Sequence, residues 1–228
     1  MKYRQKANVP LIFAITNFKF FTLISPQIKN LIFDLGGVII NLDTARTFES
    51  FSKLSGIPAN ELQHKSKQVS LFGDYEKGMM TDQEFRGKLK DFLEGDFSDV
   101  EIDQAWNDML LDIPPAKFQL LERLRRTHQT YLLSNTNNIH LKCFNQIVND
   151  TTGLDAIDSY FHKAYYSHLL KMRKPDDEIY LHVLEQNNLN PVETLFMDDN
   201  RDNLEGAKRV GIQVAHIAHP DDLYLLFA

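Results

Sequence analysis

The sequence is poor in cysteine and has no excess of positive charge. Cys143 is the only cysteine among 228 residues, so an intrachain disulfide is impossible, and we expect a reducing, cytoplasmic location. The net charge is -6 and the sequence pI is about 5.7. This balance argues against a general nucleic-acid-binding protein, and no nucleic-acid partner is expected.

Long apolar runs are also scarce. One apolar stretch, residues 9–25, follows three basic residues, an order that mimics a secretory signal. Asn17 and Lys19 interrupt it, and no clean small-x-small cleavage site follows. A signal or anchor is the alternative; we interpret residues 1–29 as an N-terminal extension. No run of about 20 apolar residues occurs elsewhere, so no membrane partner is expected.

The most informative feature is a carboxylate at the end of an apolar run. Asp34 follows Leu31-Ile32-Phe33 and precedes Gly36 and Gly37. The run is typical of a short central strand. A side chain at the carboxyl end of such a strand points to the crevice where open α/β sheets bind ligands. The glycines would allow the backbone to approach a ligand closely.

Three further motifs follow in chain order: Ser134-Asn135 after an apolar strand, Lys174-Pro175 after a basic loop, and Asp198-Asp199 after another apolar strand. From residue 112 onward, predicted strands alternate with predicted helices, which indicates a parallel sheet with helices on both faces. Residues 44–111 instead show helical periodicity, and we expect four helices there. The predicted fold is therefore α/β, a doubly wound parallel sheet with an inserted helical domain.

This ordered set resembles the haloacid dehalogenase superfamily of phosphohydrolases, from about residue 30 to residue 211. Within it, Asp-Leu-Gly-Gly, Ser-Asn-Thr-Asn, Met-Arg-Lys-Pro and Phe-Met-Asp-Asp-Asn resemble bacterial sugar phosphatases of the α-D-glucose-1-phosphatase type. The resemblance implies a discontinuous Rossmann-like core, residues 30–43 and 112–228. It also implies that residues 44–111 form a cap over the active site.

The resemblance implies roles for the strand-end residues. Asp34 would be the nucleophile that forms an aspartyl-phosphate. Ser134 and Asn135 would donate hydrogen bonds to phosphoryl oxygens, and Lys174 would supply positive charge. Taken singly, Ser134 could be a helix cap and Lys174 a solvated loop residue.

A cation is also implied, because a carboxylate repels a phosphate dianion. Mg²⁺ prefers oxygen ligands. We assign it Asp34, the backbone carbonyl of Gly36, and Asp199 as the principal ligands. Asp198 and Asn203 are candidates that would act next to the ligands or through water.

Contacts to the rest of the substrate are expected from the insert. Asp43 and Arg46 match a similar Asp-x-x-Arg in the resembled phosphatases. Tyr75 lies in the polar, glycine-bearing segment 72–78, which is typical of a lid. The alternatives are a surface salt bridge for Arg46 and packing for Tyr75. His140 is interpreted as a capping or supporting histidine.

One departure from the family pattern concerns Gly36, where many relatives carry a second Asp that acts as general acid and base. Such help is worth about 100- to 10,000-fold in rate. A hexose 1-phosphate, with its more acidic anomeric leaving group, is therefore favoured; the alternative is that another residue supplies the proton.

The predicted function is Mg²⁺-dependent hydrolysis of a small phosphate monoester by a monomer or homodimer. Three alternatives stay open. The first is a metal-independent 2-haloacid dehalogenase, although the Asp198-Asp199 pair argues for a metal-dependent phosphatase. The second is a β-phosphoglucomutase-like transferase. The third is a degenerate member that binds a phosphorylated ligand or a protein.

Overall fold

A five-stranded parallel sheet forms the centre of the protein. The computed structural model describes residues 24–228, and the sheet order is β3-β2-β1-β4-β5. The strands are β1 (Asn30–Phe33), β2 (Gln129–Ser134), β3 (Lys163–Tyr166), β4 (Thr194–Asp198) and β5 (Gln213–His216). Because β1 lies between β2 and β4, the strand order reverses beside it, and such switch points are where open α/β sheets bind ligands.

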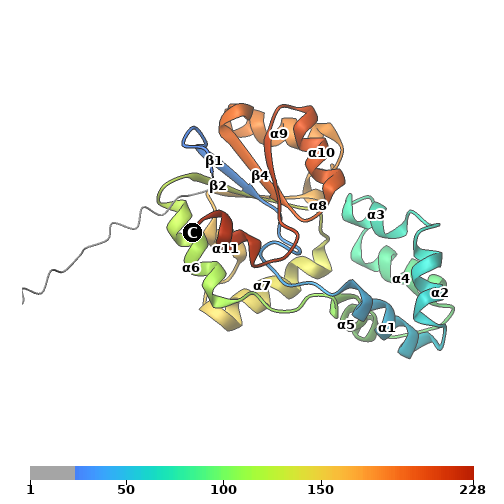
Figure 1. Ribbon diagram of the computed structural model, residues 1–228. Coiled ribbons are helices and arrows are strands. Elements are labelled where there is room, and N and C mark those ends of the chain that lie inside the picture. The colour runs from blue at the N-terminus through green and yellow to red at the C-terminus, as the bar shows by residue number, and fades with distance from the viewer. Residues whose placement is uncertain (1–23) are drawn as a thin grey trace, which may run out of the picture.

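Helices cover both faces of the sheet (Figure 1). On one face lie α6 (Pro115–Arg125), α7 (Asn138–Thr152) and α11 (Asp222–Leu226); on the other lie α9 (Asp177–Asn187) and α10 (Arg201–Arg209). Short elements α8 (Ser167–Leu170), η1 (Ile157–Tyr160) and η2 (Pro191–Glu193) complete the core. In β1, Leu31 and Phe33 join one apolar cluster and Ile32 joins the other, as the two-residue period of a strand requires.

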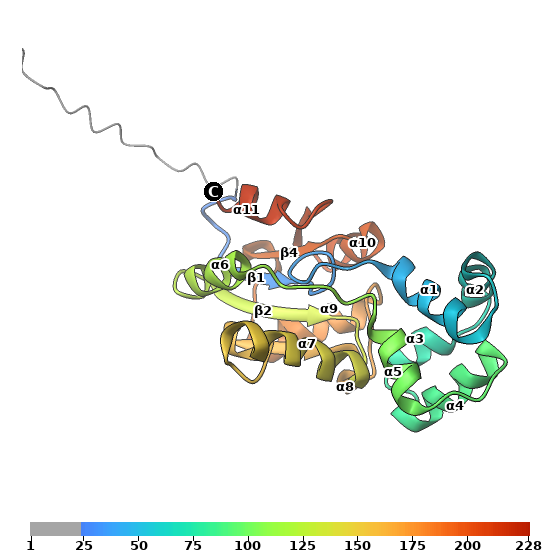
Figure 2. The same ribbon diagram turned by 90° about the horizontal axis from the view of Figure 1, so that it is seen from below.

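Of the six helices between β1 and β2, the first five pack as a separate group at one end of the sheet (Figures 1 and 2). They are α1 (Thr44–Ser55), α2 (Ala59–Ser66), α3 (Leu71–Glu76), α4 (Asp82–Leu93) and α5 (Asp99–Asn107), together called the helical insert below. Thr81 and Ser98 form capping boxes at the starts of α4 and α5. Phe51, Phe85 and Trp106 lie in the apolar cluster of the insert.

The expected count of four helices was wrong. The segment 72–78, expected to be a polar lid loop, lies largely in α3, and Gly78 follows it with φ of +65°. Leu71 and Tyr75 are one helical turn apart and are both buried, so the segment has an apolar side that stabilises it as a helix.

The insert contacts the core mainly through α7. The Trp106 ring stacks on His140 with the ring centroids 4.6 Å apart. Asp82, at the start of α4, accepts hydrogen bonds from Asn138 at 2.7 Å and Lys142 at 3.3 Å. Ile139 of α7 belongs to the apolar cluster of the insert. The insert therefore lies directly against a helix that follows a predicted catalytic motif.

The predicted N-terminal extension falls mostly on residues 1–23, which lie outside the described residues. Its last part packs on the core: Ile28 is buried, and Lys29 Nζ lies 2.6 Å from Glu193 Oε1. Within residues 24–228, none of the helices has the length and hydropathy needed to span a bilayer.

Candidate active site

The polar ends of the parallel strands meet at one edge of the sheet. Asp34 directly follows β1, Ser134 ends β2 and Asp198 ends β4. Carboxylate oxygens of Asp34, Asp198 and Asp199 lie within 4.8 Å of one another. The structure thus brings together residues that are up to 165 positions apart in the sequence.

Lys174 joins two of these carboxylates. Its side chain is buried, and Nζ donates to Asp34 Oδ1 at 2.7 Å, to Asp198 Oδ2 at 2.8 Å and to the Leu133 carbonyl at 2.9 Å. Burial opposes the charge, but Asp198 and Asp34 together raise the pKa of Lys174. The lysine therefore stays charged and holds the Asp34 carboxylate in one orientation.

Asp198 is fully buried and its oxygens are already occupied. Oδ1 accepts from the Asn200 backbone N–H at 2.7 Å, and Asn203 Nδ2 lies 3.1 Å from Oδ1 and 3.0 Å from Oδ2. Lys174 takes the remaining place on Oδ2. Asp198 therefore anchors Lys174, and its expected role beside the metal ligands or through water stays a prediction. Asp199 is exposed by comparison and is the carboxylate free to bind a cation.

The cluster carries more negative than positive charge. Burial raises the pKa of Asp34 to about 7; Lys174 opposes this rise, whereas the charges of Asp198 and Asp199 add to it. Burial and the neighbouring Asp198 likewise raise the pKa of Asp199. Three carboxylates against one lysine leave a deficit of positive charge that a divalent cation would correct. An all-oxygen donor set of this kind fits Mg²⁺.

The glycine turn after Asp34 makes room for Asp199. At Gly37 the φ angle is +68°, and a Cβ there would lie 2.6 Å from Asp199 Oδ2. Any other residue would push against the carboxylate and strain the backbone. At Gly36 a Cβ would lie 2.5 Å from Leu42 Cδ1, so the place of the missing second Asp is partly filled by a leucine.

Ser134 and Asn135 differ in what their side chains do. Ser134 is buried at the strand end, and within residues 24–228 its hydroxyl has only a long 3.5 Å contact with the Asn135 carbonyl. Asn135 instead pairs with the backbone of Lys174: Nδ2 donates to the carbonyl at 2.9 Å, and Oδ1 accepts from the N–H at 2.9 Å. Its amide is therefore largely committed to holding the Lys174 loop, and one N–H is left for a phosphoryl oxygen.

The predicted contacts from the insert are placed less favourably. Asp43 caps α1, with Oδ1 accepting from the Ala45 N–H at 3.1 Å. Arg46 is exposed on the first turn of α1 and forms no ion pair within residues 24–228. Tyr75 is buried, its hydroxyl donates to Asp82 Oδ1 at 2.7 Å, and its ring stacks on Phe85. The expected substrate contact from Tyr75 is corrected to packing, because both its ring and its hydroxyl are used inside the insert.

Residues near the site that the sequence interpretation missed come from other elements. Arg173 Nη2 donates to Glu76 Oε2 at 2.7 Å and so joins α3 to the residue before Lys174. Lys117 on α6 is buried and donates to the Val38 carbonyl, in the turn after Asp34, at 2.8 Å. Burial lowers the pKa of Lys117 to about 8. For Lys117, the available sequence signal was a lysine among the apolar residues of a core helix. No sequence signal pointed to Glu76.

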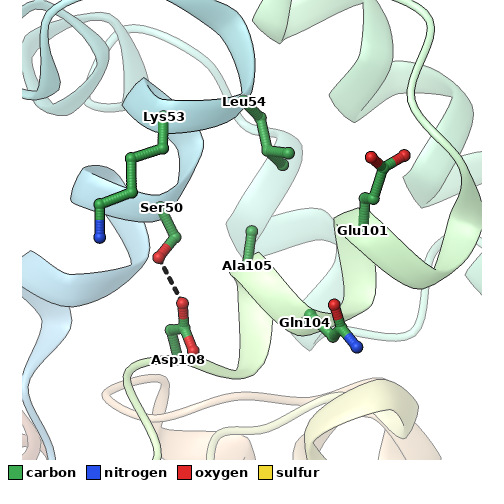
Figure 3. A pocket seen from close by; sticks show the side chains of 7 residues that line it. All are labelled: Ser50, Lys53, Leu54, Glu101, Gln104, Ala105 and Asp108. Carbon is green, nitrogen blue, oxygen red and sulfur yellow. Dashed lines mark hydrogen bonds between the residues drawn. The ribbon is translucent and has the colours of Figure 1, made fainter.

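A separate surface pocket of about 220 Å³ lies between α1 and α5. Figure 3 shows its lining, with Ser50 hydrogen-bonded to Asp108 and Lys53 and Glu101 on the two facing helices. None of the strand-end residues lines this pocket, so it is distinct from the carboxylate cluster.

The haloacid dehalogenase-like hydrolase family matches residues 28–211, the part of the chain that contains all four motifs. The protein belongs to this family. The chain is 31% identical over 189 residues to D-ribitol-5-phosphate phosphatase of Bacteroides thetaiotaomicron, a match over 82% of this chain and 90% of the relative.

Solved structures agree with the fold. The crystal structure of the family enzyme BT-2542 from Bacteroides thetaiotaomicron has a TM-score of 0.81 and 39% sequence identity, covering 88% of this chain and 98% of that one. The same enzyme in complex with magnesium and inorganic phosphate has a TM-score of 0.75 and 39% identity, covering 83% and 93% of the two chains. Magnesium in that neighbour and the carboxylate cluster here point to the same cofactor.

Proposed function

We propose that the protein is a Mg²⁺-dependent phosphatase that hydrolyses a small sugar or polyol phosphate, with Asp34 as the nucleophile. The observation that carries this proposal is the buried triad in which Lys174 bridges Asp34 and Asp198, with Asp199 beside it. A buried lysine that fixes one carboxylate oxygen leaves the other free to attack. Of the two carboxylate oxygens of Asp34, only Oδ1 has a hydrogen-bond partner within the described residues.

In the proposed first step, Asp34 Oδ2 attacks phosphorus, and the bond between phosphorus and the alcohol oxygen breaks. The product is an aspartyl-phosphate, and the leaving oxygen takes a proton from solvent water, which regains one from the attacking water in the second step. In the second step water attacks phosphorus, releases phosphate and restores the carboxylate. Lys174 and the Ser134 hydroxyl would bind the phosphoryl oxygens during both steps. Mg²⁺, held by Asp34, Asp199 and the Gly36 carbonyl, would offset the charge between carboxylate and phosphate.

The leaving group determines how much the missing acid at Gly36 costs. The sequence favoured a hexose 1-phosphate for this reason. The Bacteroides thetaiotaomicron relative is named for D-ribitol 5-phosphate, which is an ester of a primary alcohol. We therefore extend the proposed substrate class to sugar and polyol phosphates in general, with hexose 1-phosphates as one member.

The helical insert is proposed to be the cap of the site, with the core formed by residues 30–43 and 112–228 and the insert by residues 44–111. Its separate apolar cluster supports this division. A bridge between Leu42 and Leu110 holds the two chain segments that link the insert to the core side by side. Such a connection permits movement of the insert as a unit.

The deciding experiment compares wild type with Asp34→Asn in a phosphate-release assay, with Mg²⁺ and with chelator. The panel contains hexose 1-phosphates, D-ribitol 5-phosphate, nucleotides and flavin phosphates. We expect the variant to lose at least about 1,000-fold in kcat/KM, because the amide cannot form the phosphoryl-enzyme. Asp155→Asn is the matched control, since Asp155 is exposed and has no side-chain hydrogen bond or ion pair within the described residues.

Release that survives chelation or the Asp34→Asn change would contradict the proposal. Chloride release from a 2-haloacid without added metal would instead support the dehalogenase alternative. Binding of phosphate esters without any turnover would support the degenerate, ligand-binding alternative.

A further inference from the structure

An ion pair between the insert and the core lies beside the proposed phosphate site. Arg173 Nη2 donates to Glu76 Oε2 at 2.7 Å, and Arg173 directly precedes Lys174 in the chain. Glu76 and Arg173 are 97 positions apart in the sequence. Burial raises the pKa of the Glu76 carboxyl, and the charges of Arg173 and then Lys174 oppose this rise. The ion pair therefore ties Glu76 to the loop that carries the lysine holding Asp34.

The position of Glu76 is fixed by its surroundings. The hydroxyl of Ser167, the first residue of α8, donates to the Glu76 carbonyl at 2.6 Å. Lys77 Nζ lies 2.9 Å from Asp176 Oδ2 and forms a second bridge between the insert and the core. Figure 1 shows α3 next to α8, so this end of the insert is the part that meets the core near the strand ends. A side chain held this way can position a ligand group.

The pair retains hydrogen-bonding capacity that no neighbour uses. Oε1 of Glu76 has no hydrogen-bond partner within residues 24–228, and the side chain is a quarter exposed. Of the guanidinium nitrogens of Arg173, only Nη2 has an acceptor in the same part of the chain, and the side chain is 34% exposed. An acceptor and a donor thus lie on two adjacent groups whose charges cancel. This combination suits neutral hydroxyl groups, which donate and accept together, and a second phosphate would meet the negative charge of Glu76.

We propose that the Glu76–Arg173 pair binds hydroxyl groups on the alcohol portion of the substrate and so selects polyol and sugar phosphates over plain alkyl phosphates. This inference rests on the proposed phosphatase function. Specificity of this type is strong because a site built for hydroxyl groups is left with unpaired polar groups when they are missing.

The test compares D-ribitol 5-phosphate with pentyl phosphate, which has the same number of carbons and a primary leaving oxygen but no hydroxyl groups. Glu76→Gln keeps the shape of the side chain and removes its charge. We expect it to lower kcat/KM for the ribitol ester by about 10- to 100-fold, as for loss of a hydrogen bond to a charged group. Turnover of pentyl phosphate should stay within about twofold. Arg173→Gln should likewise lower kcat/KM for the ribitol ester relative to that for pentyl phosphate.

Lys77→Gln is the matched control, because it breaks a neighbouring ion pair between the insert and the core that has no predicted role in binding. It should leave the ratio of the two substrates unchanged. Thermal unfolding of each variant separates a folding defect from a change in preference.

An equal loss on both esters would overturn the inference, since the pair would then act on the reaction or on the fold. Unchanged turnover of the ribitol ester would overturn it as well. Failure of the proposed function gives a different result, because wild type would then release phosphate from neither ester in a manner that depends on Asp34.

Discussion

The carboxylate cluster at the strand ends and the interface between the insert and the core both use charged side chains, but in different surroundings. This interface, called the seam below, includes the Glu76–Arg173 and Lys77–Asp176 pairs and the contact of Trp106 with His140. In the cluster, Lys174 is 1% exposed and contacts two carboxylates. At the seam, Lys77 is 34% exposed and Asp176 is 47% exposed. Exposed pairs contribute at most about 1 kcal/mol, whereas breaking a buried pair costs about 3–5 kcal/mol. Burial therefore makes the cluster a fixed unit and leaves the seam able to adjust.

The largest effect should come from Lys174→Met. Removing the lysine leaves the carboxylates of Asp34 and Asp198 buried without their cation. We expect the free energy of unfolding to fall by about 3–5 kcal/mol and kcat/KM for phosphate esters to fall at least about 1,000-fold. Urea unfolding at pH 7 and phosphate release measure the two losses.

Lys77→Met serves as the control for that comparison, because it removes a cation of the same type from an exposed pair. Its free energy of unfolding should change by less than about 1 kcal/mol. Similar losses in the two variants would show that burial does not separate the two regions.

The seam also contains one deeply buried titratable group, and this offers the next test. His140 stacks on Trp106; Nδ1 accepts from Asn137 Nδ2 at 3.2 Å, and Nε2 donates to the Trp106 carbonyl at 3.1 Å. Burial lowers the pKa of His140 to about 4, from 6.5. Below pH 6.5 the unfolded chain binds a proton that the folded protein does not. The contribution of neutral His140 to the free energy of unfolding is therefore complete above pH 6.5. It is lost as the pH falls toward 4, and the total loss is about 3 kcal/mol.

The pH dependence is measured as the free energy of unfolding between pH 7.5 and 4.5 for wild type and His140→Phe. The phenylalanine keeps a ring against Trp106 and cannot titrate. Burial also lowers the pKa values of His128 and His168, so only the difference between the two proteins reports His140. Parallel curves would show that His140 is not neutral in the folded protein.

The sequence predicted the family, the parallel sheet and the residues at its carboxyl edge. Asp34, Asp198 and Asp199 end up together because each follows an apolar strand, and parallel strands end at a common edge. Lys174 reaches them from a loop, and this placement depended on the family pattern rather than on periodicity. Their catalytic roles stay predictions.

The seam could not be predicted because its contacts depend on how two separate units dock. Glu76 and Arg173 are 97 residues apart, and neither motif nor spacing connects them. Tyr75 was ambiguous for the same reason: an aromatic residue in an amphipathic helix can face a ligand or a neighbouring helix, and here Phe85 and Asp82 occupy both its ring and its hydroxyl. The additional helix α3 was not predicted because only its two buried residues, Leu71 and Tyr75, show the spacing of a helical turn.

The smallest effect tested compares a glycine beside the carboxylate cluster with an exposed glycine of the helical insert. A Cβ at Gly37 would lie 2.6 Å from Asp199 Oδ2 at a φ of +68°, whereas a Cβ at Gly87 in α4 would meet nothing within 4 Å. Gly37→Ala should destabilise the protein by about 1–3 kcal/mol and raise the Mg²⁺ concentration needed for half-maximal activity by about 10-fold, because it displaces a proposed ligand. Gly87→Ala should stabilise it by about 0.5–1 kcal/mol, since alanine favours a helix interior, and leave Mg²⁺ dependence unchanged. Urea unfolding and Mg²⁺ titration of phosphate release measure both. If Gly37→Ala retained wild-type Mg²⁺ dependence, Asp199 would not be the ligand whose position the glycine turn protects.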